Sequence, residues 1–248
     1  MRRTAILMAG QRPGLDRLAG TGLKALLPVA GRPMVARVVD TLLACPDIGD
    51  IVVLAQDTDP IRAVLPDDPR IGYARSGVGI AHSVAGVAAD RWPLFVTTAD
   101  HPLLRPETIS AFLAGADDCD VAVGLVEERV VRRRFPDNRR TWLSFARGRW
   151  TGANLFALNG AGALKALNLW ASVEQDRKKG WKLIARFGPW LLLRAATRTI
   201  TIDDAIAAGG RRFGFAAKAV PLDDPLAAVD VDKPEDHVLA EAVLEGRA

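Results

Sequence analysis

The chain has 248 residues, of which 49% are hydrophobic and 25% are charged, with a formal net charge of +4 at pH 7. These proportions are ordinary for a globular fold and exclude a chain dominated by disorder. The mild positive charge favours small anionic ligands over nucleic acid, which usually requires a denser basic stripe.

The cysteines and the apolar runs bear on the compartment. Cys45 and Cys119 form no metal-binding or redox motif, so a reduced, cytoplasmic protein is expected. The apolar run before Gly10 lacks a cleavage-site pattern and indicates a first strand rather than a signal peptide. No apolar stretch reaches transmembrane length.

In the first half, short apolar runs alternate with segments of helical pattern. The predicted strands are Thr4–Ala9, Ile51–Ala55, Arg70–Ala74, Leu94–Thr98 and Val121–Val126. The predicted helices are one opened by Pro33, Ile61–Leu65, Ile80–Ala89 and one opened by Pro106. This alternation predicts βαβ units in a mostly parallel sheet, with the ligand at the carboxyl ends of the strands.

The pattern changes after Glu128. Arg129–Arg140 is basic and poor in apolar residues, and residues 161–208 are predicted to be mainly helical. The predicted strands of this half are Trp142–Ala146, Asn154–Leu158, Phe213–Val220 and Ala228–Val231. Pro234 is expected to open the last helix.

The first candidate site segment follows the first strand. Ala9 and Gly10 are small enough for the backbone to approach a ligand, and backbone N–H groups there can bind phosphate oxygens. Arg12, Arg17 and Lys24 could neutralise charge on a leaving pyrophosphate. An ordinary turn after a strand explains the small residues equally well.

Two aspartates follow or precede regular elements at places suited to a metal. Asp100 comes directly after the predicted strand Leu94–Thr98, and Asp232 comes before the helix opened by Pro234. Carboxylates at such places can hold Mg²⁺. Both also suit a turn or a helix N-cap, and His101 is interpreted as a turn residue.

Taken together, these segments resemble the superfamily of nucleoside-diphosphate-sugar pyrophosphorylases and cytidylyltransferases, which has a GT-A-like Rossmann fold. The resemblance rests on the segment from Leu7 to Pro33, on Ala99–Leu104 and on Val231–Asp236, and it covers most of the chain. It implies that Asp100 and Asp232 hold the metal and that Lys24 contacts the triphosphate.

The phosphate loop departs from the pattern of that superfamily. The usual loop has a second small residue after its glycine, where this chain has Arg12. The loop arginine of the superfamily could correspond to Arg12 or to Arg17.

The resemblance also implies the fold class and the division of the chain. We expect an α/β, three-layer Rossmann-like nucleotidyltransferase fold with a mostly parallel central sheet and a helical insertion in the C-terminal half. A single domain is predicted over residues 1–248. Residues 1–127 would bind the NTP, residues 128–227 the acceptor, and residues 228–248 would form the metal-ligand turn and the closing helix.

The base of the nucleotide is predicted from Ser76–Val84, which resembles the base-binding stretch of the methylerythritol-phosphate cytidylyltransferases. Gly77 and Ser83 have the matching spacing, which favours CTP. The alternative is GTP, because the plan of the chain also resembles molybdenum-cofactor guanylyltransferases. A helix start, with Ser83 as a packing residue, is the structural alternative.

The acceptor is expected to be a small anionic phosphate monoester. Thr151, Gly152 and Asn154 resemble a segment that lines the acceptor site in relatives, although a hairpin turn fits them equally well. Three arginines could bind acceptor phosphate or carboxylate, or form a solvated surface. They are Arg133, Arg134 and Arg139.

Other partners and functions stay open at this point. Residues 178–194 mix cations, tryptophan and leucine, which suits a helical lid or homodimer face better than a membrane interface. A non-catalytic nucleotide sensor on the same fold is the alternative to an enzyme. An NAD-dependent oxidoreductase and a phosphate-loop NTPase are disfavoured because their glycine motifs are missing.

Overall fold

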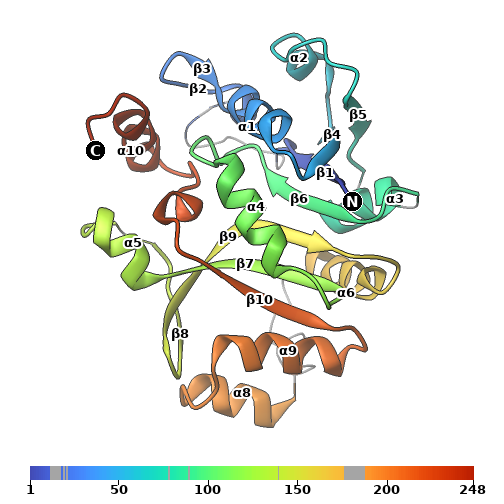
Figure 1. Cartoon of the computed structure of the whole chain (residues 1–248), viewed down its shortest axis with the longest axis vertical. Coiled ribbons are helices and arrows are strands. Elements are labelled where there is room, and N and C mark those ends of the chain that lie inside the picture. Colours follow the sequence, from blue (N-terminus) through green and yellow to red (C-terminus); the bar gives the residue numbers. More distant parts are fainter. Residues whose placement is uncertain are drawn as a thin grey trace.

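A computed structural model describes residues 1–11, 18, 20, 22–77, 79–88, 90–138, 140–175 and 188–248. Among these residues, eight strands form one sheet whose main path runs β10-β7-β9-β6-β1-β4-β5 (Figure 1). The strands are β1 (Arg3–Met8), β4 (Ile48–Ala55), β5 (Ile71–Arg75), β6 (Leu94–Thr98), β7 (Val121–Glu127), β8 (Leu143–Phe145), β9 (Gly148–Leu158) and β10 (Ala217–Leu222).

The sheet is mostly parallel. Its exception on the main path is β9, which runs antiparallel to both β6 and β7, and β8 pairs antiparallel with β9 at one end. A separate two-stranded ribbon joins β2 (Pro28–Val29) to β3 (Arg32–Pro33).

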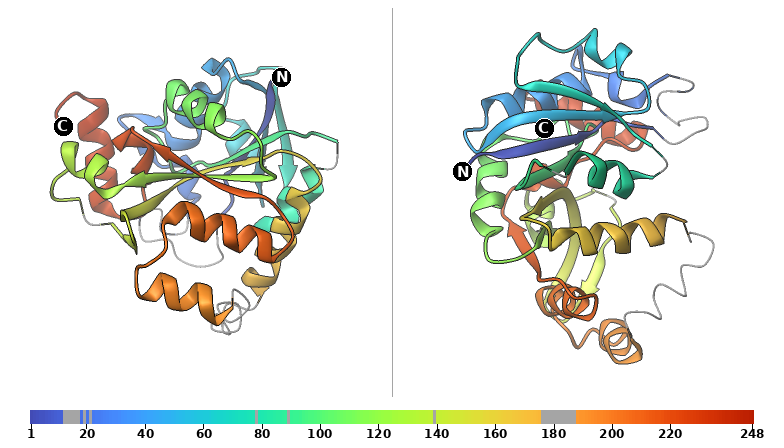
Figure 2. Two further views of the ribbon diagram at one scale, coloured as in Figure 1. Left: turned by 60° about the horizontal axis from the view of Figure 1, so that its bottom comes forward. Right: turned by 90° about the vertical axis from the view of Figure 1, so that its right-hand side faces the viewer.

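Helices cover both faces of the sheet (Figure 2). They are α1 (Met34–Ala44), α2 (Asp59–Arg62), α3 (Ile80–Ala88), α4 (Pro106–Gly115), α5 (Glu128–Arg134), α6 (Ala163–Gln175), α8 (Pro189–Ala196), α9 (Ile202–Arg212) and α10 (Pro234–Leu244). Two short 3-10 turns are η1 (Lys24–Leu26) and η3 (Pro225–Ala228).

The alternation of side chains along buried strands produces the layers. In β1, Leu7 packs into the cluster that includes α1 and α4, whereas its neighbour Ile6 packs with α3 and α6 on the opposite face. Phe112 of α4 lies against Phe95 of β6, with ring centroids 6.1 Å apart. The predicted three-layer α/β fold with a helical C-terminal part is confirmed.

Several predicted boundaries in the second half were wrong. The basic stretch after Glu128 forms α5, because Val130 and Val131 supply an apolar face that is buried. The expected strand Ala228–Val231 is instead the end of η3 and an irregular segment. The reversal before β9 lies between Phe145 and Gly148, earlier than expected.

The parallel register brings the ends of three strands to one edge. Met8 of β1 is paired with Leu54 of β4 on one side and with Thr98 of β6 on the other. The residues that follow β1 and β6 therefore leave the sheet side by side, at the edge where ligands bind in such folds. Within the described part of the chain, no helix combines the length and apolar character needed to cross a membrane.

Candidate active site

Lys24 lies between two aspartates that are far from it in the sequence. Its ammonium nitrogen is 2.9 Å from Oδ2 of Asp100 and 2.5 Å from Oδ1 of Asp232. The side chains of Lys24 and Asp100 are largely buried, with 17% and 22% exposed, whereas Asp232 has 59% of its side chain exposed. The structure therefore brings together the three residues that the sequence predicted as the charged centre of the site.

Backbone hydrogen bonds hold the two aspartates in place. The amide of Ala99 donates to the carbonyl of Met8, and the amide of Val231 donates to the carbonyl of Asp100, each at 2.9 Å. The segment before α10 is thus tied directly to the end of β6. Asp100 and Asp232 approach each other because their own main chains are hydrogen-bonded to neighbouring segments.

The turn at Asp232 is stabilised by the first turn of α10. Oδ2 of Asp236 accepts hydrogen bonds from the backbone amides of Asp232 and Lys233, at 3.1 and 3.0 Å. An acidic side chain is favourable there because the helix N-terminus carries partial positive charge. The carboxylate of Asp236 therefore positions the backbone of Asp232.

Two glutamines that the sequence reading overlooked hold the loop of Lys24. The backbone amide of Lys24 donates to Oε1 of Gln11 at 2.7 Å. Gln11 exchanges backbone hydrogen bonds with the side-chain amide of Gln56, both at 3.0 Å. Gly10 leaves room for this amide, because a Cβ there would lie 2.9 Å from Oε1 of Gln56. The sequence offers little indication of this role, because the one notable feature of Gln56 is that it directly follows a strand.

The electrostatics of Lys24 and Asp100 suit a site that receives a cation and an anion together. Burial by itself would lower the pKa of Lys24, but Asp100 and Asp232 outweigh it and raise that pKa, so the ammonium stays charged. Oδ1 of Asp100 is buried and has no hydrogen-bond partner among the described residues. A buried carboxylate oxygen without a partner is a suitable ligand for a hard divalent cation.

The two carboxylates suit a magnesium ion that also binds the substrate better than they suit a metal ion bound by protein side chains alone. Within the described residues, no group of three or more His, Cys, Asp or Glu side chains could hold a metal ion. Mg²⁺ is commonly bound through one or two carboxylates together with substrate phosphates and waters. Asp100 and Asp232 match that arrangement.

A second polar cluster lies next to the aspartates. The carboxylate of Asp230 accepts hydrogen bonds from the guanidinium of Arg140 and from Nδ2 of Asn154, the latter at 3.4 Å. Asn154 is one of the predicted acceptor-site residues, and its φ of +53° is in the left-handed region that asparagine tolerates. Asp230 and Arg140 were missed as site residues, although the Val-Asp-Val-Asp alternation marks Asp230 as facing the same side as Asp232.

The surroundings of Asp230 and His101 determine their protonation states. Burial would raise the pKa of Asp230, but the guanidinium of Arg140 outweighs this effect and lowers it, so this carboxylate is ionised. His101 is 1% exposed, and burial lowers its pKa and keeps its ring neutral. Both of its ring nitrogen atoms have no hydrogen-bond partner among the described residues.

The predicted base-binding segment forms the start of α3. Oγ of Ser83 accepts from the amide of Gly77 at 2.9 Å and donates to the carbonyl of Gly79 at 2.8 Å. The carboxylate of Glu174 in α6 accepts from the amides of Ile80 and Ala81, both at 3.2 Å. Ser83 therefore orders the loop before the helix, and Glu174 was not anticipated because it comes from a distant helix.

The predicted acceptor residues separate into two groups. Thr151 and Gly152 lie on β9 together with Asn154, which contacts Asp230. Thr151 is buried and Gly152 is exposed. Arg133 and Arg134 lie on α5 and bind elsewhere: Arg133 pairs with Asp223 at 3.6 Å.

Arg134 donates to the carbonyl of Ala248 at 3.0 Å and lies over the ring of Phe135. Its side chain thus faces the C-terminal end of the chain. Arg12, Arg17 and Arg139 lie outside the described residues, as do residues 178–187 of the predicted lid, whereas Pro189–Ala196 is α8.

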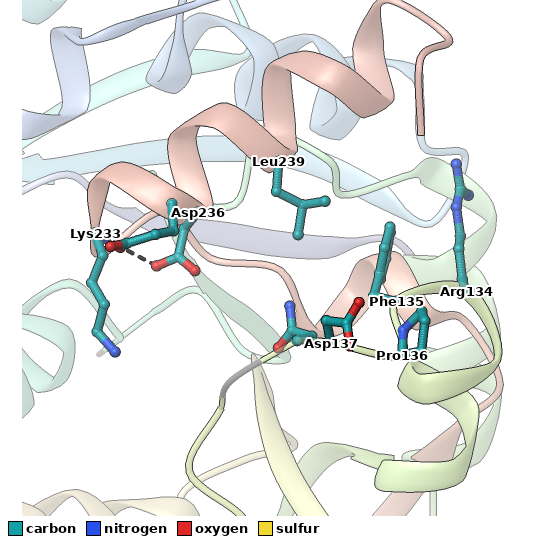
Figure 3. A pocket seen from close by; sticks show the side chains of 9 residues that line it. Arg134, Phe135, Pro136, Asp137, Lys233, Asp236 and Leu239 are labelled. Atoms are coloured by element: carbon teal, nitrogen blue, oxygen red, sulfur yellow. Dashed lines mark hydrogen bonds between the residues drawn. The ribbon is translucent and has the colours of Figure 1, made fainter.

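A cavity of about 650 Å³ with charged and apolar lining residues lies beside this site, between the end of α5 and the start of α10 (Figure 3). Arg134 and Lys233 line it, but so do Asp137 and Asp236, so its charges are mixed. Lys24, Asp100 and Asp232 are not among the described residues that line it. The cavity therefore adjoins the charged centre without containing it.

Comparisons with known proteins identify the family of the chain. The sequence model of the MobA-like NTP transferase domain matches residues 5–198. The bifunctional protein GlmU of Brevibacillus brevis is 34% identical over 112 residues, which are 44% of this chain and 24% of that protein. GlmU of Halorhodospira halophila is 29% identical over 212 residues, which are 73% of this chain and 43% of that protein. The chain spans about a quarter of the length of the first of these relatives and less than half of the second.

Solved structures share the whole fold. A hypothetical transferase from Thermus thermophilus superposes with a TM-score of 0.83 and 28% identity, covering 96% of this chain and 100% of that one. The 4-diphosphocytidyl-2C-methyl-D-erythritol synthase of Anaerococcus prevotii has a TM-score of 0.59 and 14% identity, covering 98% and 96%. A CMP:2-keto-3-deoxy-manno-octonic acid synthetase complexed with CTP has a TM-score of 0.59 and 16% identity, covering 99% and 100%.

Proposed function

Since the chain belongs to the family of MobA-like NTP transferase domains, we propose that it transfers CMP from CTP to a small anionic phosphate monoester and releases pyrophosphate. The family match shows that the chain is a nucleotidyltransferase. The observation that supports the reaction is the meeting of Lys24 with Asp100 and Asp232 at the carboxyl edge of the sheet.

In the proposed reaction, an oxygen of the acceptor phosphate attacks the α-phosphorus of the nucleotide. The new phosphorus–oxygen bond forms as the bond to the α,β-bridging oxygen breaks, and its electron pair leaves with pyrophosphate. The acceptor is already anionic, so no general base is required. The protein contributes position and charge stabilisation.

The charged residues have separate roles in this proposal. The Lys24 ammonium offsets negative charge that builds up on the leaving pyrophosphate. Asp100 and Asp232 would hold Mg²⁺, which neutralises phosphate charge when it is bound with the nucleotide. Gln11 accepts a hydrogen bond from the backbone of Lys24 and is itself bonded to Gln56, and these contacts support that role for Lys24. Asn154 would bind the acceptor from β9.

The preference for CTP rests on the match of Gly77 and Ser83 to a base-binding stretch and on the fold shared with a synthetase complexed with CTP. GTP is the second candidate. It is supported by the resemblance of the chain's plan to molybdenum-cofactor guanylyltransferases. The hydroxyl of Ser83 is already bonded to Gly77 and Gly79, so it does not by itself select cytosine.

A screen of pyrophosphate release tests the proposal. Each of the four ribonucleoside triphosphates is combined, with Mg²⁺, with a panel of phosphate monoesters that includes phosphoglycerates, polyol phosphates and sugar 1-phosphates. The proposal expects pyrophosphate only when an acceptor is present, and most of it with CTP. Equal or better turnover with GTP would replace the base assignment. Nucleotide binding without any pyrophosphate release would instead support a non-catalytic sensor.

A further inference from the structure

An apolar cavity of about 620 Å³ lies between the sheet and the helices of the C-terminal half. Every described residue that lines it is apolar or glycine. Val123 and Phe156 line it from the sheet, Trp170 from α6 and Leu192 from α8. Its volume is within the range of small-molecule sites, which is roughly 300–1,000 Å³.

The outer wall of this cavity is formed by α8, which buries little of its surface against the rest of the fold. Within the described part of the chain, α8 has no buried side chain, although its sequence is Pro-Trp-Leu-Leu-Leu-Arg-Ala-Ala. Leu191, Leu192 and Ala195 face the cavity. The helix lies beyond α9, at the end of the molecule opposite β4 and β5 (Figure 1). A helix of this composition is stabilised only when apolar groups cover its inner face.

Several residues that line the cavity are close in sequence to segments of the proposed active site. Met8 lines it and directly precedes Ala9 and Gly10. Gly152 also lines it, two residues before Asn154 on β9. Ile80 and Ala81 line it where α3 begins, immediately after the predicted base-binding turn.

The shape of the cavity restricts its occupant. Lining residues come from the sheet on one side and from α6, α8 and α9 on the other, so the occupant must fit between two layers of the same chain. A second folded copy could cover the outside of α8 but not enter this space. The absence of polar residues among the described lining excludes a sugar or nucleotide, which would leave its polar groups unpaired.

We propose that this cavity binds the hydrocarbon chain of an amphiphilic acceptor, a long-chain alkyl or acyl phosphate monoester whose phosphate lies at the proposed acceptor position near Asn154. This inference rests on the proposed function, and it replaces the small acceptor by a phosphate monoester that carries a long hydrocarbon chain. The polar end would react as described above, while the chain replaces water between α8 and the sheet. Burial of each methylene contributes about 0.8 kcal/mol, which is roughly fourfold in affinity.

The first test measures binding without turnover. A dodecyl phosphate with bromine at the chain end is titrated below its micellar concentration, and quenching of tryptophan fluorescence is followed, with bromobutyl phosphate as the short-chain control. The dodecyl compound is expected to bind at least about 100-fold more tightly. Trp170→Phe should remove most of the quenching. Equal binding of both compounds, or quenching unaffected by Trp170→Phe, would overturn the proposal.

A matched pair of variants on α8 locates the chain. Ala195 lines the cavity, whereas its neighbour Ala196 is exposed and is not among the lining residues. Ala195→Phe should weaken binding of dodecyl phosphate by at least about tenfold and leave butyl phosphate unchanged. Ala196→Phe should change neither. If both variants behave like the wild type, the cavity is not the binding site.

The second test separates this inference from the proposed function. Pyrophosphate release is measured with CTP and each phosphate. A lower KM for dodecyl than for butyl phosphate, raised again by Ala195→Phe, supports both proposals. Chain-dependent quenching without pyrophosphate release would refute the transferase reaction with these acceptors and leave the cavity assignment standing. Release from short phosphates without any chain-length effect would refute the cavity assignment alone.

Discussion

The ammonium of Lys24 is the charge on which the site is centred. It contacts both carboxylates that are proposed to hold magnesium, and its pKa is raised because their attraction exceeds the cost of burial. When a nucleotide and its metal bind, the same ammonium can exchange these carboxylates for phosphate oxygens. In this proposal, Lys24 becomes free to bind the triphosphate because Asp100 and Asp232 would bind the metal instead of the ammonium.

Replacement of Lys24 by Met should therefore lower kcat by about 10²–10³, because one charge that stabilises the transition state is lost. Pyrophosphate release under saturating nucleotide measures the effect. Lys218→Met is the control, since Lys218 is exposed on β10 and its ammonium donates to the backbone carbonyl of Asp117. A Lys24→Met enzyme with near wild-type kcat would remove this residue from the mechanism.

The pair of Asp230 and Arg140 is mostly buried, with 17% and 13% of the side chains exposed. Asp230→Ala leaves the guanidinium without its partner and should cost on the order of 3 kcal/mol in unfolding free energy. Urea denaturation measures this. Asp223→Ala breaks the exposed pair with Arg133 and should cost less than about 1 kcal/mol. Equal losses in the two variants would show that burial of the Asp230 pair has no energetic weight.

At the scale of elements, helix ends and close helix–strand contacts decide the positions of the site segments. Asp236 stabilises the start of α10 and with it the turn of Asp232, while Glu174 of α6 stabilises the start of α3. On the other side of the cavity, α9 packs so closely on β10 that only glycine fits at one position. A Cβ on Gly210 would lie 2.6 Å from Cβ of Ala217 and 2.8 Å from the carbonyl of Phe215.

Gly210→Ala should accordingly destabilise the protein by about 1–3 kcal/mol, because the backbone of the α9–β10 connection must move. Gly86→Ala is the matched change in a helix with open space around the new methyl group, and it should stabilise by about 0.5–1 kcal/mol. Thermal unfolding of both variants compares the signs. A stabilising Gly210→Ala would contradict the close contact.

For the molecule as a whole, the sheet brings to one edge the distant segments that are proposed to bind nucleotide, metal and acceptor. Any ligand that binds there only in the folded state stabilises the entire fold. The proposed magnesium site couples the nucleotide to the segment before α10. In that segment, Asp232 contacts Lys24 across 208 residues of sequence.

Addition of CTP and Mg²⁺ at about 100 times the dissociation constant should stabilise the fold by about 2.7 kcal/mol. For a chain of this size that corresponds to a rise in Tm of about 5–10 °C. Scanning fluorimetry with and without EDTA measures the metal contribution, which Asp100→Asn should abolish. A rise that is the same with EDTA would exclude magnesium from the nucleotide complex.

Much of the local structure was predictable from the sequence, because it depends on residues close together in the chain. The strand Leu94–Thr98 was predicted to the residue, since a continuous apolar run needs burial on both faces. Asp100 and Asp232 could be named as candidate metal ligands because of their positions beside a strand and a helix. The family and the three-layer fold followed from the order of these segments and were confirmed.

What only the tertiary structure decided are the contacts between segments that the sequence leaves far apart. Lys24 meets its two aspartates, Arg140 meets Asp230, and Glu174 reaches α3, each across at least seventy residues of chain. Such pairs have no local signature, because a hydrogen bond or ion pair depends on distance in space and not on spacing in sequence. The apolar cavity belongs to the same class, since Leu192 and Val123 look like ordinary core residues until their packing leaves space between them.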